Sequence, residues 1–184
     1  GNIEDVDMTK KLQGDGTNSC GGKEVSVINS GSVTTYGVGA VGILAQSIGG
    51  GGGYDAIRGL AGSAGGNGTG SSVKIENSGN IYTKAASAHA IFAQSAGKGS
   101  GAVDIINRGF VGVEETTSYA VSAQSNSGNI FVDNYGNIYG SVRTDGLVNT
   151  FNNNVNAFFM PGSTVNLGGG TLTNAGTFSP GGLE

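Results

Sequence analysis

The chain has 184 residues, a formal net charge of −4 and only 12% charged residues, yet it carries 37 glycines, two prolines and no tryptophan. An average soluble domain has roughly 25% charged residues and roughly 7% glycine, so this composition favours a β-rich domain with many tight turns. Without a cluster of Lys or Arg, the chain lacks the cations that binding to nucleic acid or to an anionic membrane surface requires. No apolar run approaches the roughly 18 residues of a membrane-spanning helix.

The two ends of the sequence stand apart from the rest. Residues 1–24 show no repeat, and we expect them to form a non-repetitive segment or a cap. Because the chain begins without Met and shows no signal peptide, we interpret it as part of a longer protein, and Leu183–Glu184 as a cloning remnant. Cys20 is the only cysteine, so it is either a free thiol or the partner of a cysteine outside this sequence.

Residues 25–182 repeat the pattern apolar-x-apolar-x-Asn-x-Gly-x-apolar. The alternating apolar residues indicate a strand with one buried face. Asn followed by Gly indicates a turn in which glycine supplies a positive φ, and the last apolar residue begins a second strand. The five copies are VSVINSGSV (Val25–Val33), VKIENSGNI (Val73–Ile81), VDIINRGFV (Val103–Val111), IFVDNYGNI (Ile130–Ile138) and GTLTNAGTF (Gly170–Phe178).

A third apolar strand, ending in Ala-Gln-Ser, follows each of the first three copies. The glutamine lies 17 residues after the repeat asparagine each time, since 46 − 29, 94 − 77 and 124 − 107 all equal 17. The distance between successive repeat asparagines varies (48, 30, 27, then 40), and in the first three copies the variation falls after this strand. The interval of 40 has room for two coils of about 20 residues, the second using Phe158, Val165 and Leu167.

Three short strands cannot bury their apolar faces alone, but stacked copies can, by pairing each strand with its equivalent in the next coil. The sequence therefore predicts an all-β fold, a right-handed single-stranded parallel β-helix with about three strands per coil. A β-sandwich, which would show dissimilar strands joined by hairpin turns, is a weaker alternative. In-register stacking also predicts a ladder of hydrogen-bonded amides, formed by Asn29, Asn77, Asn107, Asn134 and Asn174.

The unit GILAQSIGGGGG, the NSGxI turns and the segment GSTVNLGGGTLTNAGTFSPGG resemble passenger regions of bacterial autotransporters (type V secretion) and related large repetitive adhesins. The resemblance covers most of the chain from Val25 onward. It implies a β-helical stalk that is secreted or held at the bacterial cell surface or outer membrane, supporting adhesion, autoaggregation or biofilm formation. The implied partners are a host or bacterial surface glycan or protein, or further copies of the chain. We expect the membrane to be reached only through the family's C-terminal translocator barrel, which is absent from this sequence.

The glycine run Gly49–Gly53 does not match a known binding loop. It is followed neither by Lys-Ser/Thr nor by a helical pattern, which a phosphate-binding loop requires. The stretch GGGGGYDAI occurs once, whereas calcium-binding β-helix repeats recur. We therefore expect no cofactor and no metal, and interpret the glycines as the exit of a long loop excursion over residues 47–72. This excursion contains a candidate contact loop, Tyr54, Ile57, Arg58 and Leu60.

Catalytic residues are not expected either. His89 is the only histidine, and one histidine supplies neither a metal site nor a catalytic triad. β-Helical polysaccharide lyases and hydrolases need clustered acids on one exposed sheet, and the acids here are scattered: Asp55, Glu76, Asp104, Glu114, Glu115, Asp133 and Asp145. We predict a structural protein without enzyme activity, with a carbohydrate-active or carbohydrate-binding β-helix protein as the alternative.

Overall fold

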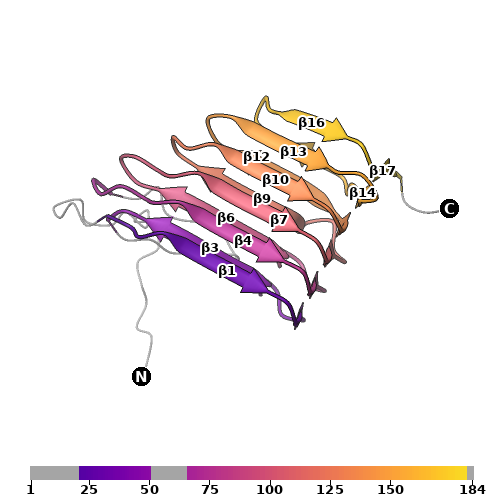
Figure 1. The fold of residues 1–184 in the computed structure, drawn as a ribbon. Helices are drawn as coiled ribbons and strands as arrows, with labels where there is room; N and C mark the ends of the chain where they lie inside the picture. The colour runs from indigo at the N-terminus through magenta and orange to yellow at the C-terminus, as the bar shows by residue number, and fades with distance from the viewer. Residues whose placement is uncertain (1–20, 51–65, 182–184) are drawn as a thin grey trace, which may run out of the picture.

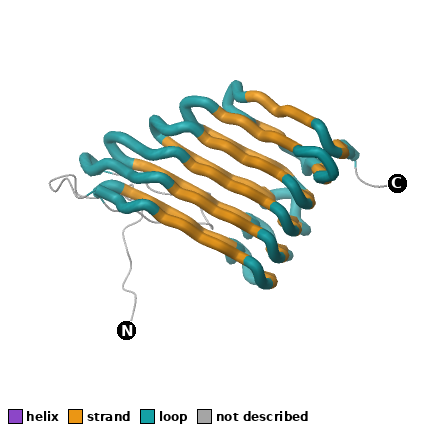
Figure 2. Tube along the Cα trace, viewed as in Figure 1, coloured by secondary structure: helices purple, strands orange, loops and turns teal. Residues whose placement is uncertain are grey.

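The computed structural model describes residues 21–50 and 66–181, which form strands and turns without any helix (Figure 2). Successive strands wind into coils that stack from the N-terminal to the C-terminal side (Figure 1). The first three coils are β1 (Val25–Asn29), β2 (Ser32–Thr35), β3 (Ile43–Ile48); β4 (Val73–Asn77), β5 (Asn80–Thr83), β6 (Ile91–Ala96); and β7 (Val103–Asn107), β8 (Phe110–Val113), β9 (Tyr119–Ser125). The others are β10 (Ile130–Asn134), β11 (Asn137–Tyr139), β12 (Ser141–Asp145); β13 (Asn149–Asn153), β14 (Phe158–Met160), β15 (Val165–Asn166); and β16 (Thr171–Asn174), β17 (Thr177–Phe178).

Equivalent strands of successive coils pair side by side in three sheets. Sheet A has the order β1-β4-β7-β10-β13-β16, sheet B the order β2-β5-β8-β11-β14-β17, and sheet C the order β3-β6-β9-β12-β15. Every strand pair is parallel, and the repeat positions lie in register, as in Asn29 beside Asn77 and Gln46 beside Gln94. The predicted parallel β-helix with about three strands per coil is confirmed.

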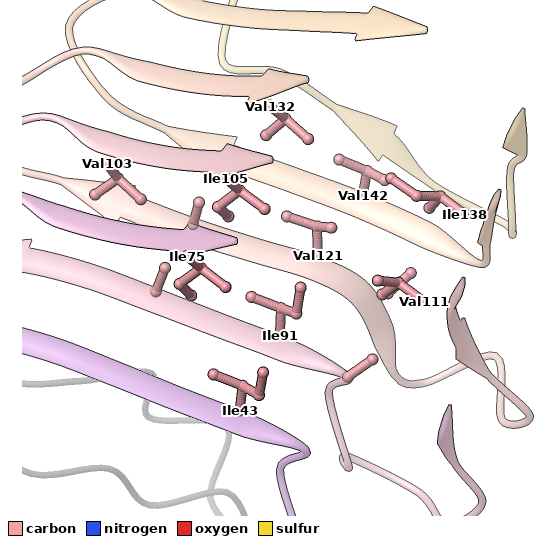
Figure 3. Close-up of a cluster of buried hydrophobic side chains, with 14 of the residues drawn as sticks. Ile43, Ile75, Ile91, Val103, Ile105, Val111, Val121, Val132, Ile138 and Val142 are labelled. Atoms are coloured by element: carbon pink, nitrogen blue, oxygen red, sulfur yellow. The ribbon is translucent and has the colours of Figure 1, made fainter. Parts of the chain in front are cut away.

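The core is the space that the three sheets enclose (Figure 3). Every second residue of a strand points inward, as the alternation predicted. Sheet A contributes Val73 and Ile105, sheet B contributes Ile81, and sheet C contributes Ile91 and its small neighbour Ala93, all at most 1% exposed. Stacked branched aliphatic side chains therefore fill most of the coil interior.

The long interval between Asn134 and Asn174 contains two coils, as its length suggested. The ladder asparagine of the additional coil is Asn153, 19 residues after Asn134 and 21 before Asn174. Phe158 and Val165 begin its second and third strands, and Leu167 packs against the core.

The loop excursion leaves and re-enters the coil at neighbouring points. Ser47 and Ile48 still belong to β3, so the excursion begins at Gly49 rather than at residue 47. The Gly66 amide donates to the Gly49 carbonyl oxygen at 2.6 Å, and a Cβ on Gly49 would collide with the Gly68 backbone. Glycine is required here because two backbones lie in contact. The candidate contact loop (Tyr54, Ile57, Arg58 and Leu60), Cys20 and Leu183–Glu184 lie outside the described residues.

Candidate functional site

A column of six asparagines builds the A–B corner, the turn from sheet A to sheet B. The Nδ2 of each asparagine donates to the Oδ1 of the asparagine in the next coil, at 2.7–2.9 Å. The four inner members are at most 1% exposed, so their amides take their hydrogen bonds from one another and from backbone carbonyl oxygens of the turns. The column contains the five predicted residues, Asn29, Asn77, Asn107, Asn134 and Asn174, together with Asn153, which the sequence pattern missed.

The glycine two residues after five of the six asparagines has a different role from the one predicted. None of Gly31, Gly79, Gly109, Gly136 and Gly176 has a positive φ. Instead, a Cβ on Gly79 would collide with the carbonyl oxygen of Gly31, and a Cβ on Gly109 with that of Gly79. The prediction of a left-handed glycine is therefore wrong: the position excludes a side chain because the turn backbones of successive coils stack in direct contact.

Serines secure the C–A corner, the connection from sheet C to the next strand of sheet A. The Ser95 hydroxyl donates to the Ser71 carbonyl oxygen at 2.7 Å and accepts from the Gly101 amide at 2.9 Å. Ser47 and Ser125 do the same: each hydroxyl donates to a carbonyl oxygen before the preceding strand of sheet A and accepts from an amide before the next one. These hydroxyls explain the repeated Ala-Gln-Ser sequence as a structural feature.

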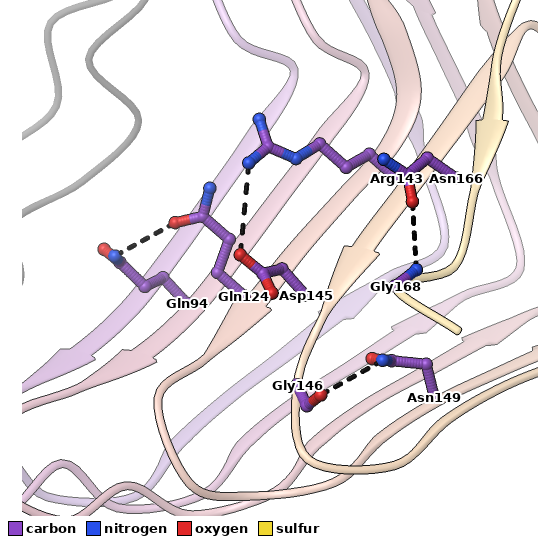
Figure 4. Close-up of polar contacts among 8 residues, drawn as sticks. All are labelled: Gln94, Gln124, Arg143, Asp145, Gly146, Asn149, Asn166 and Gly168. Carbon is purple, nitrogen blue, oxygen red and sulfur yellow. Dashed lines mark hydrogen bonds and ion pairs between the residues drawn. The ribbon is translucent and has the colours of Figure 1, made fainter. Parts of the chain in front are cut away.

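The outer face of sheet C carries a column of polar side chains (Figure 4). Gln46 donates to Gln94 at 2.9 Å, and Gln94 donates to Gln124 at 3.2 Å. Asp145 follows in register beside Gln124, and its carboxylate lies 4.0 Å from the guanidinium of Arg143. The glutamines of the 17-residue spacing thus form a second, shorter amide ladder.

The acids of the sequence do not converge on one groove among the described residues. Glu76 lies 2.6 Å from Lys74, whose hydrogen bond and positive charge lower the pKa of this exposed carboxyl. Asp133 accepts from Asn152 at 2.8 Å. Partial burial raises the pKa of Asp104. Glu114 and Glu115 lie in the turn after β8, and no three His, Cys, Asp or Glu side chains of the described ranges gather where a metal ion could bind.

His89 has a structural role. Its Nδ1 accepts a hydrogen bond from the Tyr119 amide at 3.1 Å, and its ring meets the Tyr119 ring edge-on at 5.3 Å. Burial, with a smaller contribution from Arg143, lowers the pKa of the imidazole. The neutral ring that accepts this hydrogen bond is therefore the favoured form near neutral pH.

A row of four aromatic rings, which we call the aromatic row, crosses the outer face of sheet B. Its members are Tyr82 on β5, Phe110 on β8, Tyr139 on β11 and Phe158 on β14, with successive ring centroids 6.1, 5.1 and 5.3 Å apart. Gly112 keeps the row continuous, because a Cβ there would lie 2.6 Å from the Phe110 ring. This row was not predicted from the sequence, although an aromatic residue three or five positions after the ladder asparagine is its signal in each of these coils.

An open pocket of about 150 Å³, which we call the notch, lies beside Tyr139. The fourth coil passes from β11 to β12 through Gly140 alone, whereas the coils on either side use the longer turns Glu114–Ser118 and Pro161–Thr164. Gly140 has a φ of 126°, and a Cβ there would collide with the Val113 side chain. The shortened turn thus creates a recess whose wall includes the row member Tyr139.

Comparison of the chain with protein-family models, with curated proteins and with solved structures finds no match. Within the part of the chain that the structure describes, no helix is long and apolar enough to cross a membrane. Inferences about function therefore depend on the sequence pattern and on the geometry above.

Proposed function

We propose that the chain is a stiff stalk segment of a bacterial cell-surface adhesin that resembles the autotransporters, either secreted or held at the outer membrane. Its function is to hold other parts of the protein away from the cell and so to support adhesion, autoaggregation or biofilm formation. It acts without catalysis. The observation that supports this proposal most directly is the asparagine ladder, which continues unbroken through all six coils.

One-dimensional stacking of coils makes a rod. Each coil contacts mainly its neighbours, so the length grows with the number of coils. Neighbouring strands are about 4.8 Å apart, and every coil is joined to the next by backbone hydrogen bonds in up to three sheets. Bending such a rod would stretch hydrogen bonds on one side, which makes it a good spacer.

A replacement experiment tests the spacer function. In the bacterium that carries the protein, the segment is exchanged either for an unrelated β-helical segment with the same number of coils or for a Gly/Ser linker with the same number of residues. We expect the β-helical replacement to retain surface labelling by antibody and cell aggregation, and the flexible linker to lose aggregation. Equal aggregation with both replacements, or labelling confined to the cell interior, would contradict the proposal.

The carbohydrate-binding alternative has one specific observation in its favour, the aromatic row on sheet B.

A further inference from the structure

We propose that the outer face of sheet B binds a neutral glycan chain, whose sugar rings stack on the aromatic row while one sugar or substituent enters the notch. This inference goes beyond the stalk function, because a rod can act as a spacer without any ligand-binding face.

The aromatic row is additional to the core. Beneath it the inward positions of sheet B are already filled by Ile81, Val111, Ile138 and Phe159, none of which is exposed. The four rings are half-buried on the opposite face, where polar side chains are the usual choice. Contacts between the rings stabilise the sheet. The rings are tilted by 31–56° from one to the next and leave a continuous, stepped apolar strip that is partly open to solvent.

Amide side chains border this strip. Asn80 lies two residues before Tyr82 on β5, and Asn137 lies two residues before Tyr139 on β11, so both point to the same outer face as the rings. Both asparagines are exposed. An amide both donates and accepts hydrogen bonds, as a hydroxyl group does. A surface of rings beside amides therefore complements a sugar ring, which presents C–H groups on its face and hydroxyls around its edge.

The notch limits what can be bound at the end of the row. At about 150 Å³ it is smaller than the roughly 300–1,000 Å³ of pockets that enclose a drug-sized ligand. It combines the apolar surfaces of Tyr139, Met160 and Pro161 with the polar groups of Glu114 and Ser118. A single sugar or ring substituent fits this size, while the rest of a longer ligand lies along the row.

Charge decides between glycans and other ligands that stack. Nucleic-acid bases also stack on aromatic rows, but their phosphates require a cationic groove. Here the notch is bordered by the carboxylates of Glu114 and Glu115 and is not cationic. Lys84 supplies a single positive charge, with its Nζ 5.2 and 5.8 Å from the ring centroids of Tyr36 and Tyr82. The two carboxylates near the row would also repel the negative charges of an acidic polysaccharide. The ligand that we infer therefore carries no acidic groups.

The binding test uses the full chain and three defined probes: cellohexaose and N-acetylchitohexaose, which are neutral, and hexagalacturonic acid. Two of the six Tyr lie in the row and the chain has no Trp, so a change in tyrosine fluorescence that is lost in a Tyr139 variant reports binding at the row; calorimetry gives the dissociation constants. We expect at least one neutral probe to bind at least about tenfold more tightly than the acidic probe. Absence of binding by both neutral probes at millimolar concentration, or preference for the acidic one, would overturn the proposal.

Substitutions locate the binding site. Tyr139→Ala removes the ring shared by the row and the notch, and we expect it to weaken binding by at least about tenfold, as expected for an anchor residue. Tyr135→Ala is the matched control, because Tyr135 is 49% exposed at the A–B corner and stacks on Arg108. If the alanine variant unfolds, Tyr139→Leu replaces it in the test, because leucine keeps an apolar side chain on β11 while it removes the aromatic ring. Wild-type affinity in a folded Tyr139 variant, or an equal loss in Tyr135→Ala, would place the binding elsewhere.

Discussion

The A–B and C–A corners join the same coils but tolerate change very differently. At the A–B corner five of the six turns have two residues, as in Ser78–Gly79. At the C–A corner the connections range from residues 146–148 to residues 49–72. The first corner is held by amides and backbones that touch the equivalent groups of the next coil, so an insertion in one coil would displace its neighbours. The second is held by serine hydroxyls that bond to residues two positions before the strands of sheet A, such as Ser71 and Gly101 for Ser95. The outer part of each connection is not held by these bonds and is free to vary in length.

The largest effect should come from adding a side chain at the tight corner. In Gly109→Ala the new Cβ meets the Gly79 carbonyl oxygen, and because this atom belongs to the backbone, the two coils must separate. We expect the free energy of unfolding in urea to fall by more than about 3 kcal/mol. Gly31→Ala is the matched control in the first coil, where a Cβ has no atom within 4 Å; a comparable loss there would refute the stacking explanation.

Removing one amide from the ladder should have the next largest effect. Asn107→Ala deletes the hydrogen bonds to Asn77 and Asn134 and also those to the carbonyl oxygens of Gly109 and Asn137. We expect a loss of about 2–3 kcal/mol in the free energy of unfolding. Asn29→Ala, at the half-buried end of the ladder, should cost less than half as much, and equal losses at the two positions would show that ladder neighbours do not matter.

A serine of the C–A corner should matter less than a ladder asparagine. Ser95→Ala leaves the Ser71 carbonyl oxygen and the Gly101 amide without this partner. We expect a loss of about 1–2 kcal/mol, measured by urea unfolding against Ser26→Ala on the exposed face of β1. A loss larger than that of Asn107→Ala would contradict the expectation that the A–B corner contributes more to stability than the C–A corner.

Shortening the C–A corner should have the smallest effect. Deletion of residues 51–65 joins Gly50 to Gly66, which already lie side by side. Loop length contributes only weakly to stability, so we expect the free energy of unfolding to change by less than about 1 kcal/mol, with an unchanged far-ultraviolet spectrum. Loss of the β-sheet spectrum would show that the excursion is part of the folded coil.

The strand pattern predicted the fold because two signals agreed, apolar alternation and a constant distance from asparagine to glutamine. The pattern failed in the fifth coil, where a polar residue replaces an apolar one and the turn contains no glycine. In β13 the inward position expected to be apolar is Asn149, whose Nδ2 bonds to the Gly146 carbonyl oxygen at 3.1 Å (Figure 4). The turn after Asn153 has no glycine, and Asn156 adopts a φ of 67° there instead. A polar residue inside and a different turn together hid the repeat pattern of the fifth coil, which only the length of the interval indicated.

Other features depend on contacts between coils, which a single repeat does not reveal. Gly170 weakened the last copy of the pattern, yet a Cβ there would collide with the Asn149 carbonyl oxygen. The aromatic row was missed because its rings alternate between two outward columns, Tyr82 and Tyr139 in one, Phe110 and Phe158 in the other. Only the three-dimensional register shows that they form one strip.

The asparagine ladder also gives the rod a direction. Every Nδ2 donates toward the C-terminal coil and every Oδ1 accepts from the N-terminal side, so the amide dipoles add head to tail and polarise one another. A coil that joins this column must arrive with the same orientation, because a reversed coil would place donor against donor or acceptor against acceptor. The ladder therefore favours the addition of each new coil in parallel orientation onto a coil that has already folded. It disfavours antiparallel association of other strands at the ends of the rod.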